Sequence, residues 1–507
     1  MEVKKSSDSA ATIMRNRPPL YSFRSLRFIM AMLLFCALFC NSSMRTNLGM
    51  AMVCMVNNTA YSASSDSVFV SDLSTKGTCS AVEEGSAVDS GYKGTFLWDP
   101  SMQSTLVSGT AYGAMLTILP AGYLSDRFGS RFMILTSSVI VATCTLLTPF
   151  LAVFDFYALF VARVIMGFAF GFAIPPLSSL SARWFPADER SSLAALTTSG
   201  LQLSMAIGGV ISSSLCQLEF LGGWPMIFYL FGTLGLIWCC IWFVIASNSP
   251  NSNRWISDEE RIYITSAMPS KHAISRKIPW LSILSSIRVH SILLVQFSFT
   301  FVVTILQFYL PAYFRDVLHL PLKYNGLCSM LPFLCELIFK NVFAMTADYL
   351  KKHSVFSDTV VVKIFQAIGS YGTALSLVGL ALFVDCNTIW LAIMFLAFHG
   401  TCFSAGVSGS YTSTLSIAPR FAGIISSMGM FCGMLGAAIS PTVFATINPY
   451  STLEEWRIVF LMCACVYVAC GTPFVLCGSA ELQAWAKPVP KLSAVSAISV
   501  DVENNSR

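Results

Sequence analysis

The chain has 507 residues, of which 55% are hydrophobic and 11% are charged, and its formal net charge is +5. A soluble domain carries about 25% charged residues, so this composition excludes an ordinary soluble protein. We expect a chain whose solvent is lipid and which has no nucleic-acid partner.

Apolar stretches of helix length recur in two groups of six. In lipid every backbone N–H and C=O must be satisfied inside its own segment, so each stretch is expected to be a helix. The first six lie near residues 28–50, 102–123, 133–153, 157–180, 193–216 and 225–246, and the second six near 291–313, 327–347, 361–384, 388–410, 421–446 and 456–477. The sequence predicts an all-α polytopic membrane protein with twelve transmembrane helices.

These stretches divide the chain into five parts. The expected parts are a tail (1–27), a six-helix bundle (28–246) with a long loop at 58–98, a linker (247–290), a second bundle (291–478) and a second tail (479–507). The linker is rich in charge, and Ser257 followed by three acidic residues is a helix-start signal, which predicts a short amphipathic helix there.

Short loops that carry lysine and arginine predict the orientation. If the spans alternate, the N-terminus, the linker and the basic loops at Arg127, Arg183 and Lys351 share one side, which the positive-inside rule makes cytoplasmic. Both termini are then cytoplasmic, and the acidic loop 58–98 faces outward or into a lumen. We expect a plasma-membrane or an endolysosomal or vesicular location.

The two halves also resemble each other. Gly122–Asp126 closes the second span, and Ala344–Asp348 closes the eighth with a similar pattern. Six-helix halves related in this way are typical of alternating-access carriers, whose site lies at mid-membrane between the halves.

The segment from Gly122 to Arg131, GYLSDRFGSR, resembles the signature between the second and third helices of the major facilitator superfamily. Within that superfamily the chain is similar to the anion/phosphate symporter group, which includes sialin, the vesicular glutamate and nucleotide transporters, and the sodium/phosphate cotransporters. The narrower likeness covers roughly residues 24 to 485, and the blocks that carry it are residues 45–57, 96–99, 163–175, 416–423, 455–460 and 478–485.

Three positions depart from the pattern of that group. The resemblance implies a glutamate, associated with proton coupling, where this chain has Phe170, and an acidic residue where it has Ser416. A seventh-helix arginine of the vesicular glutamate type aligns approximately with Phe299. The fold is expected to survive these changes, whereas the substrate and the coupling ion do not follow from the resemblance.

Arg45 and Arg163 are the expected substrate-binding residues. Arg45 lies deep in an apolar stretch, where a charge must face a partner or a water-filled cavity, and its fork of donors suits carboxylate or phosphate. The alternative is a structural pair or an end residue that reaches water. Arg163 begins a run with Gly167 and Gly171, whose spacing indicates close helix packing; the alternative for this arginine is a wet structural residue near a helix end.

Three residues of the second half are candidates for ion coupling. Glu336 and Lys340 are four apart and are expected to share a helix face, where they neutralise each other or where Glu336 takes a proton during the cycle. His399 has a side chain that titrates near neutral pH, although a lone helical histidine is more often a packing residue.

Gly122, Asp126, Arg127, Gly129 and Arg131 form the expected gating motif. Asp126 can meet the dipole of a neighbouring helix, and the arginines can reach acidic groups across the domain boundary, which would favour one conformation over another.

Most of the seventeen cysteines lie in apolar runs and are interpreted as small hydrophobic residues and not as a disulfide or metal framework. Cys79, in the polar loop, is the exception that could pair in an oxidising compartment, and Asn57 fits the glycosylation pattern but lies close to the first span. Neither a metal nor a cofactor is expected.

The sequence thus predicts a monomeric secondary transporter, not an enzyme, that moves a small organic or inorganic anion with sodium or protons. The alternative is a non-transporting sensor on the same scaffold. The five histidines are scattered and form no catalytic cluster, and no nucleotide-binding GxxxxGK[ST] loop occurs.

Overall fold

A computed structural model describes most of the chain and is helical there, apart from a single bridge between Val56 and Phe96. The expectation for Cys79 lies outside the described residues. The described residues are 22, 25–57, 94–186, 189–218, 222–266, 278–419 and 421–486.

The first half contains seven helices of more than ten residues in the described part of the chain. They are α2 (Leu26–Met55), α5 (Pro100–Phe128), α6 (Ser130–Phe154), α7 (Phe156–Gly171), α8 (Ile174–Trp184), α9 (Arg190–Cys216) and α10 (Pro225–Ile245).

The second half repeats this plan, with two of its spans interrupted by a π-helical turn. Its helices are α13 (Ile287–Asp316), α14 (Leu322–Lys352), α15 (Asp358–Ala367) with η3 (Ile368–Gly372) and α16 (Thr373–Phe383), α17 (Ile389–Gly406) with η4 (Val407–Tyr411) and α18 (Thr412–Ile417), α19 (Ala422–Ile447) and α20 (Leu453–Cys477).

All twelve predicted apolar stretches coincide with these helices. In the part of the chain that is described, eleven continuous helical stretches are long and apolar enough to cross a membrane. The remaining long helix is α5, which has 29 residues but is richer in serine, threonine and glycine. Caps set several ends: Asp99 accepts from the N–H of Met102 before Pro100, and Thr452 and Glu455 form a capping box at α20.

The predicted helix of the linker is confirmed. α11 (Asp258–Ser266) begins directly after Ser257, whose hydroxyl accepts from the N–H of Glu260. A one-turn helix, η2 (Pro250–Ser252), precedes it, and α12 (Trp280–Leu284) follows.

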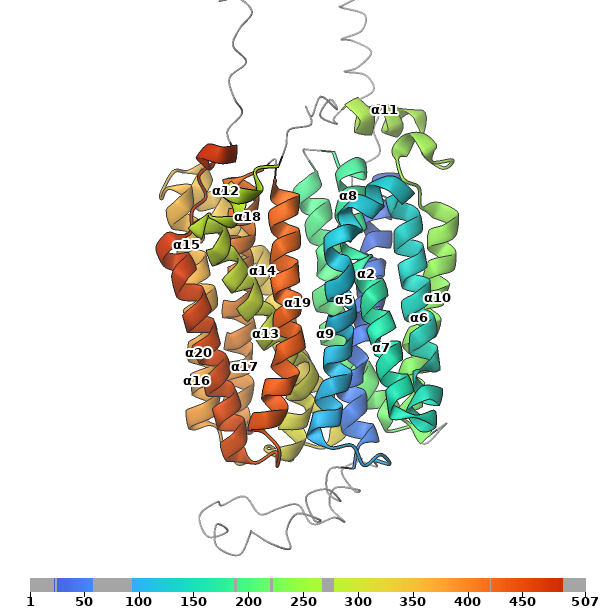
Figure 1. The fold of residues 1–507 in the computed structure, drawn as a ribbon, viewed down its shortest axis with the longest axis vertical. Coiled ribbons are helices and arrows are strands. Elements are labelled where there is room, and N and C mark those ends of the chain that lie inside the picture. The colour runs from blue at the N-terminus through green and yellow to red at the C-terminus, as the bar shows by residue number, and fades with distance from the viewer. Residues whose placement is uncertain are drawn as a thin grey trace, which may run out of the picture.

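The helices of the two halves lie on opposite sides of the molecule (Figure 1). α11 and the start of α12 lie at one end, together with both described ends of the chain, and we call this end the terminus face. The opposite end, where Val56 meets Phe96, is the loop face. The halves meet where α2 packs on α13, α9 on α14 and α5 on α19.

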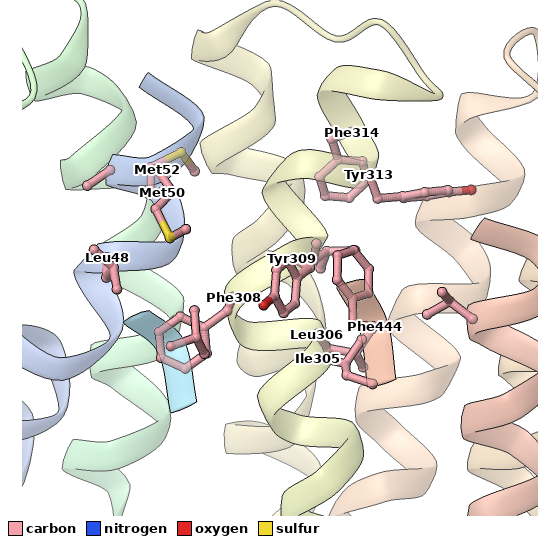
Figure 2. Packing of buried hydrophobic residues seen from close by; sticks show 14 of the residues in the cluster. Leu48, Met50, Met52, Ile305, Leu306, Phe308, Tyr309, Tyr313, Phe314 and Phe444 are labelled. Carbon is pink, nitrogen blue, oxygen red and sulfur yellow. The ribbon is translucent and has the colours of Figure 1, made fainter. Parts of the chain in front are cut away.

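These contacts between halves are closest toward the loop face. A Cβ atom on Gly49 of α2 would lie 2.9 Å from the Cα atom of Phe308 of α13, so the two backbones touch. Ser108 of α5 donates to the carbonyl of Ala438 of α19 over 3.0 Å. Figure 2 shows Phe308 pointing from α13 toward α2, while Tyr309 stacks on Phe444 of α19 with 3.8 Å between ring centroids. A continuous apolar core therefore joins the halves at this level.

The predicted close packing at Gly167 is confirmed. A Cβ atom there would lie 2.0 Å from the carbonyl oxygen of Thr110, so α5 and α7 are in backbone contact. Only a glycine allows this approach.

On the terminus face a buried ionic cluster ties the linker to the first half. Arg27 is fully buried, with its Nε 2.8 Å from Glu189 and its Nη1 3.9 Å from Glu260. Glu260 of α11 also accepts from the backbone N–H groups of Leu26 and Arg27, at the start of α2. The tail predicted to end at residue 27 thus already belongs to the bundle at Leu26, and α11 is docked rather than solvated.

Residues past α20 also pack on the bundle. Gln483 donates its N–H to the carbonyl of Ile417, and the Ser413 hydroxyl donates to the carbonyl of Ser479. Part of the segment predicted as a tail, up to residue 486, is therefore a docked strap on the second half.

The interpretation of the membrane cysteines as small hydrophobic residues is wrong for one pair. Cys54 at the loop-face end of α2 is disulfide-bonded to Cys216 at the end of α9, with Cα atoms 6.3 Å apart. Cys386 is also disulfide-bonded. Spacing of 162 residues gives no local signal for such a pair, because only the packing of α2 on α9 brings the two together.

Candidate functional site

Arg45 lies in the middle of α2 and is half-buried. Its guanidinium carbon lies 4.8 Å from the centroid of the Phe170 ring of α7, a cation–π arrangement. Its Nε has no hydrogen-bond partner among the described residues. The aromatic face holds the guanidinium in place without neutralising it.

Arg163 of α7 is fully buried, so the alternative of a wet residue at a helix end is wrong. Its Nη2 donates to the carbonyl oxygen of Arg45 over 2.9 Å, and its Nη1 lies 3.7 Å from the sulfur of Met166. Its Nε is unpaired within the described part of the chain. This contact places the guanidinium of Arg163 of α7 beside the turn of α2 that bears Arg45.

No carboxylate of the described residues forms an ion pair with either arginine. Buried charges in proteins are normally paired, because removing an ion from water without compensation is costly. Phe170 occupies the position where the resemblance implies a glutamate, so the partner that such a glutamate would offer Arg45 is missing. Two adjacent guanidinium groups without an acid are suited to a carboxylate or phosphate that arrives from outside.

The structure places Glu336 and Lys340 on α14, both largely buried and both facing α9. Gln202 lies between them: its Nε2 donates to Glu336 over 3.2 Å, and its Oε1 accepts from Lys340 over 3.4 Å. Lys340 also donates to the hydroxyl of Thr198. The pair is therefore bridged through an amide of the other half, which links the two halves through this cluster.

His399 of α17 is buried, and its Nδ1 lies 3.2 Å from the hydroxyl of Ser376 of α16. Its ring stacks on Phe403. The structure brings it together with neither arginine, and its contacts are those of a packing residue within the second half.

The residues of the expected gating motif lie at the turn from α5 to α6 on the terminus face. Gly129 has φ +86°, a conformation that favours glycine, and the side chain of Asn248 fills the space where a Cβ would lie. Arg131 donates its N–H to Asn248 over 2.8 Å and its guanidinium to the carbonyl of Phe243. Arg127 is exposed beside Phe128.

Arg131 contacts Phe243 of the first half and Asn248 at the start of the linker, so the expected reach to acidic groups across the domain boundary does not occur in this conformation. The side chains of Gly122 and Asp126 are outside the described residues, and their backbone forms the last turns of α5.

Sequence reasoning missed three buried or half-buried amides near the boundary between the halves. Asn47, Gln202 and Gln307 lie in apolar helices and contact, or face, the other half. An amide in an otherwise apolar membrane helix is the signal that would have found them, because such groups are rare away from a partner or a cavity.

The family model of the major facilitator superfamily matches residues 34–441. An uncharacterised transporter of Caenorhabditis elegans, slc-17.3, is 32% identical over 495 residues, with 94% of this chain and 92% of the relative covered. Human sialin is 29% identical, with 91% of each chain covered. The human sodium-dependent phosphate transport protein 1 is also 29% identical, with 92% and 96% covered.

Solved structures show the same fold at low identity. A D-xylose–proton symporter has a TM-score of 0.64 at 15% identity, with 90% of this chain and 98% of that chain covered. A bacterial homologue of the human lysosomal transporter Spinster also has a TM-score of 0.64, at 12% identity, with 92% and 99% covered. The chain therefore belongs to the major facilitator superfamily of multi-pass membrane transporters, and within it to the group of sialin and the sodium-dependent phosphate transport proteins.

Proposed function

We propose that this protein is a secondary transporter that moves a small organic or inorganic anion by alternating access, coupled to sodium or protons. The observation that carries the proposal is the pair Arg45 of α2 and Arg163 of α7: Arg163 donates to the carbonyl of Arg45, and neither guanidinium has an acidic partner among the described residues. The names of the relatives, sialin and sodium-dependent phosphate transport proteins, support an anion as cargo.

The arrangement of the halves supports the mechanism. Close backbone contacts such as that of Gly49 with Phe308 lie toward the loop face. Alternating access requires these contacts to separate while others form toward the terminus face, with the arginine pair between the two levels. The anion would enter while the contacts between the halves are separated toward one face, and it would leave while they are separated toward the other face.

Sidedness and location are part of the same proposal. The terminus face, which carries the linker and the basic turn at Arg131, is the cytoplasmic side, and the loop face is extracellular or lumenal. The membrane is the plasma membrane or that of an endolysosomal or vesicular compartment.

Uptake into proteoliposomes tests the function. Purified protein is reconstituted, and uptake of phosphate, urate, glutamate, sialic acid and nucleotides is measured under a sodium gradient and, separately, under a proton gradient. We expect saturable uptake of at least one anion that depends on one of the gradients. Binding of an anion without uptake would instead indicate a non-transporting sensor.

Glu336 is the proposed proton carrier, because it is a buried carboxylate whose hydrogen bond with Gln202 crosses the boundary between the halves. Under a proton gradient we expect Glu336→Gln to lose most of the gradient-dependent part of uptake, while exchange of internal for external anion, which needs no net proton movement, persists. Initial rates with and without the gradient provide the measurement.

The matched control for this variant is Glu454→Gln, because Glu454 is an exposed partner of Arg457 on α20. It should leave the gradient dependence unchanged. Equal gradient dependence in Glu336→Gln and the parent would reduce the Glu336 cluster to a structural contact between halves.

A further inference from the structure

A small cavity of about 30 Å³ lies between the halves, next to the turn of α2 that bears Arg45. Helices α2 and α9 of the first half and α13 and α14 of the second line it. The apolar part of its wall includes Met50 of α2 and Leu306 of α13, both labelled in Figure 2. This volume accommodates one or two water molecules and is too small for a whole substrate.

Three polar side chains of the cavity wall are buried and unpaired. They are Asn47 of α2 with 4% exposure, Ser212 of α9 with 0% and Gln307 of α13 with 8%. Both side-chain atoms of Asn47, the hydroxyl of Ser212 and the Nε2 of Gln307 have no hydrogen-bond partner among the described residues. Buried polar groups are normally hydrogen-bonded, so three side chains with free hydrogen-bonding groups around one cavity are suited to bind a polar group there.

Some neighbouring polar side chains are hydrogen-bonded within the protein. The Nδ2 group of Asn41 on α2 donates to the carbonyl of Ala37 and to the hydroxyl of Ser138, and Ser213, adjacent to Ser212, donates to the carbonyl of Val210. Other buried atoms of α2, namely Asn41 Oδ1 and the hydroxyls of Ser42 and Ser43, have no partner among the described residues. What distinguishes the cavity wall is therefore that three unpaired side chains from both halves converge on one space.

The chemistry of the wall selects a neutral occupant. No acidic or basic side chain lines the cavity, while the two amides supply N–H donors and a carbonyl acceptor and Ser212 can do either. Gly208 adds open space, since a Cβ atom there would meet nothing within 4 Å. A hydroxyl or an amide matches this mixture of donors and acceptors, whereas an ion would lie in the wall without a counter-charge.

We propose that Asn47, Ser212 and Gln307 form a neutral hydrogen-bonding subsite that recognises a hydroxyl or amide group on the transported anion. The proposal rests on the proposed function, because the charged group of the same anion is assigned to Arg45 of α2 and Arg163 of α7. It narrows the cargo to a polar organic anion and makes bare inorganic phosphate a poor substrate.

The subsite would also influence the transport cycle, because its hydrogen-bonding groups come from both halves, which move relative to each other during the cycle. Asn47 and Ser212 move with the first half and Gln307 with the second. A ligand hydroxyl that bridges them stabilises the conformation in which the halves meet at this level, and water takes its place when the site is empty.

Matched carboxylates with and without hydroxyl groups test the subsite. The pairs are lactate with propionate, malate with succinate, and glucuronate with cyclohexanecarboxylate, and inorganic phosphate is included. Binding to the full-length protein in detergent is measured through the ligand-induced rise of the unfolding temperature, and uptake is measured in proteoliposomes. In at least one pair we expect the hydroxylated member to bind about tenfold more tightly than its partner.

Asn47→Leu and Gln307→Leu keep the side-chain volume and remove the hydrogen bonds. Each should lower the ratio of affinities within that pair by several-fold toward one, and Ser212→Ala should lower it less. The matched control is Ser213→Ala, which should keep the parent's ratio.

The outcomes separate the two proposals. An affinity ratio that stays the same in folded Asn47→Leu and Gln307→Leu overturns the subsite alone, as does a parent protein that prefers phosphate or the unhydroxylated members. Arg45→Ala should weaken binding of both members of the pair by about 10- to 100-fold; if both bind as tightly as they bind the parent, the anion site itself is wrong. Absence of binding by every compound overturns the subsite, whereas the proposed function is overturned only if uptake of the wider anion panel also fails.

Discussion

Arg45→Ala is expected to lower anion uptake by about 10- to 100-fold at sub-saturating substrate. A hydrogen bond to a charged group contributes about 1.5–3 kcal/mol, and each 1.4 kcal/mol corresponds to a factor of ten. The guanidinium stacks on Phe170 and has no acidic partner among the described residues. Its removal is therefore expected to change the stability of the fold little and to lower the affinity for the anion strongly. Initial uptake rates, normalised to the amount of reconstituted protein, provide the measurement.

Two comparisons make the result specific. Arg45→Lys retains the charge but loses the planar fork, so intermediate uptake is expected. Arg254→Ala removes an exposed charge from the linker and should match the parent. Unchanged uptake by Arg45→Ala, in protein that retains the parent's unfolding temperature, would remove Arg45 from the anion site.

Arg27→Met is expected to lower the free energy of unfolding by about 3–5 kcal/mol, the usual effect of breaking a buried ion pair from one side. Arg27 is fully buried between Glu189 and Glu260, and methionine fills part of its volume without its charge. The variant therefore leaves two acidic groups facing each other where α2, α9 and α11 meet. Unfolding in mixed micelles titrated with SDS measures the loss.

The neighbouring Arg261 offers a matched control on the same linker helix. It is paired with Asp258 at 2.6 Å but is 43% exposed, so Arg261→Met should change the stability by less than about 1 kcal/mol. Equal losses in the two variants would mean that the Arg27 cluster is no more than a surface contact.

Phe170 connects the arginine site with the question of coupling. A glutamate at this position would offer Arg45 a carboxylate, whereas the phenyl ring offers only a cation–π contact. Under the proposed function the arginine pair is left for the cargo, and any proton-carrying role falls to another acid. Glu336, across the boundary from Gln202, is the buried acid that the structure offers for it.

The sequence by itself determined the number and place of the helices. Their signal is local: an apolar run such as the one within Leu26–Met55 must satisfy its backbone inside itself, whatever its neighbours do. The helix after Ser257 followed in the same way from its cap. Arg45 could be singled out for the same reason, since one charge in an apolar run is conspicuous without any tertiary information.

Only the tertiary structure decided which residues meet. The Cys54–Cys216 disulfide joins positions 162 residues apart, Gln202 comes between Glu336 and Lys340, and Arg131 turns to Phe243 of its own half. Each contact depends on how two helices far apart in sequence pack and rotate, and hydrophobic packing in a membrane tolerates many such arrangements.

Two buried amides, Asn47 and Gln307, show most clearly the difference between what the sequence determines and what the packing of the helices determines. Asn47 and Gln307 are visible in the sequence as polar residues in apolar helices, yet nothing in either helix says that both face one cavity without a partner. That fact arises from the junction of four helices drawn from both halves. The sequence therefore determined a membrane transporter with an arginine on its first helix, and the packing of the two halves decided which neutral groups surround it.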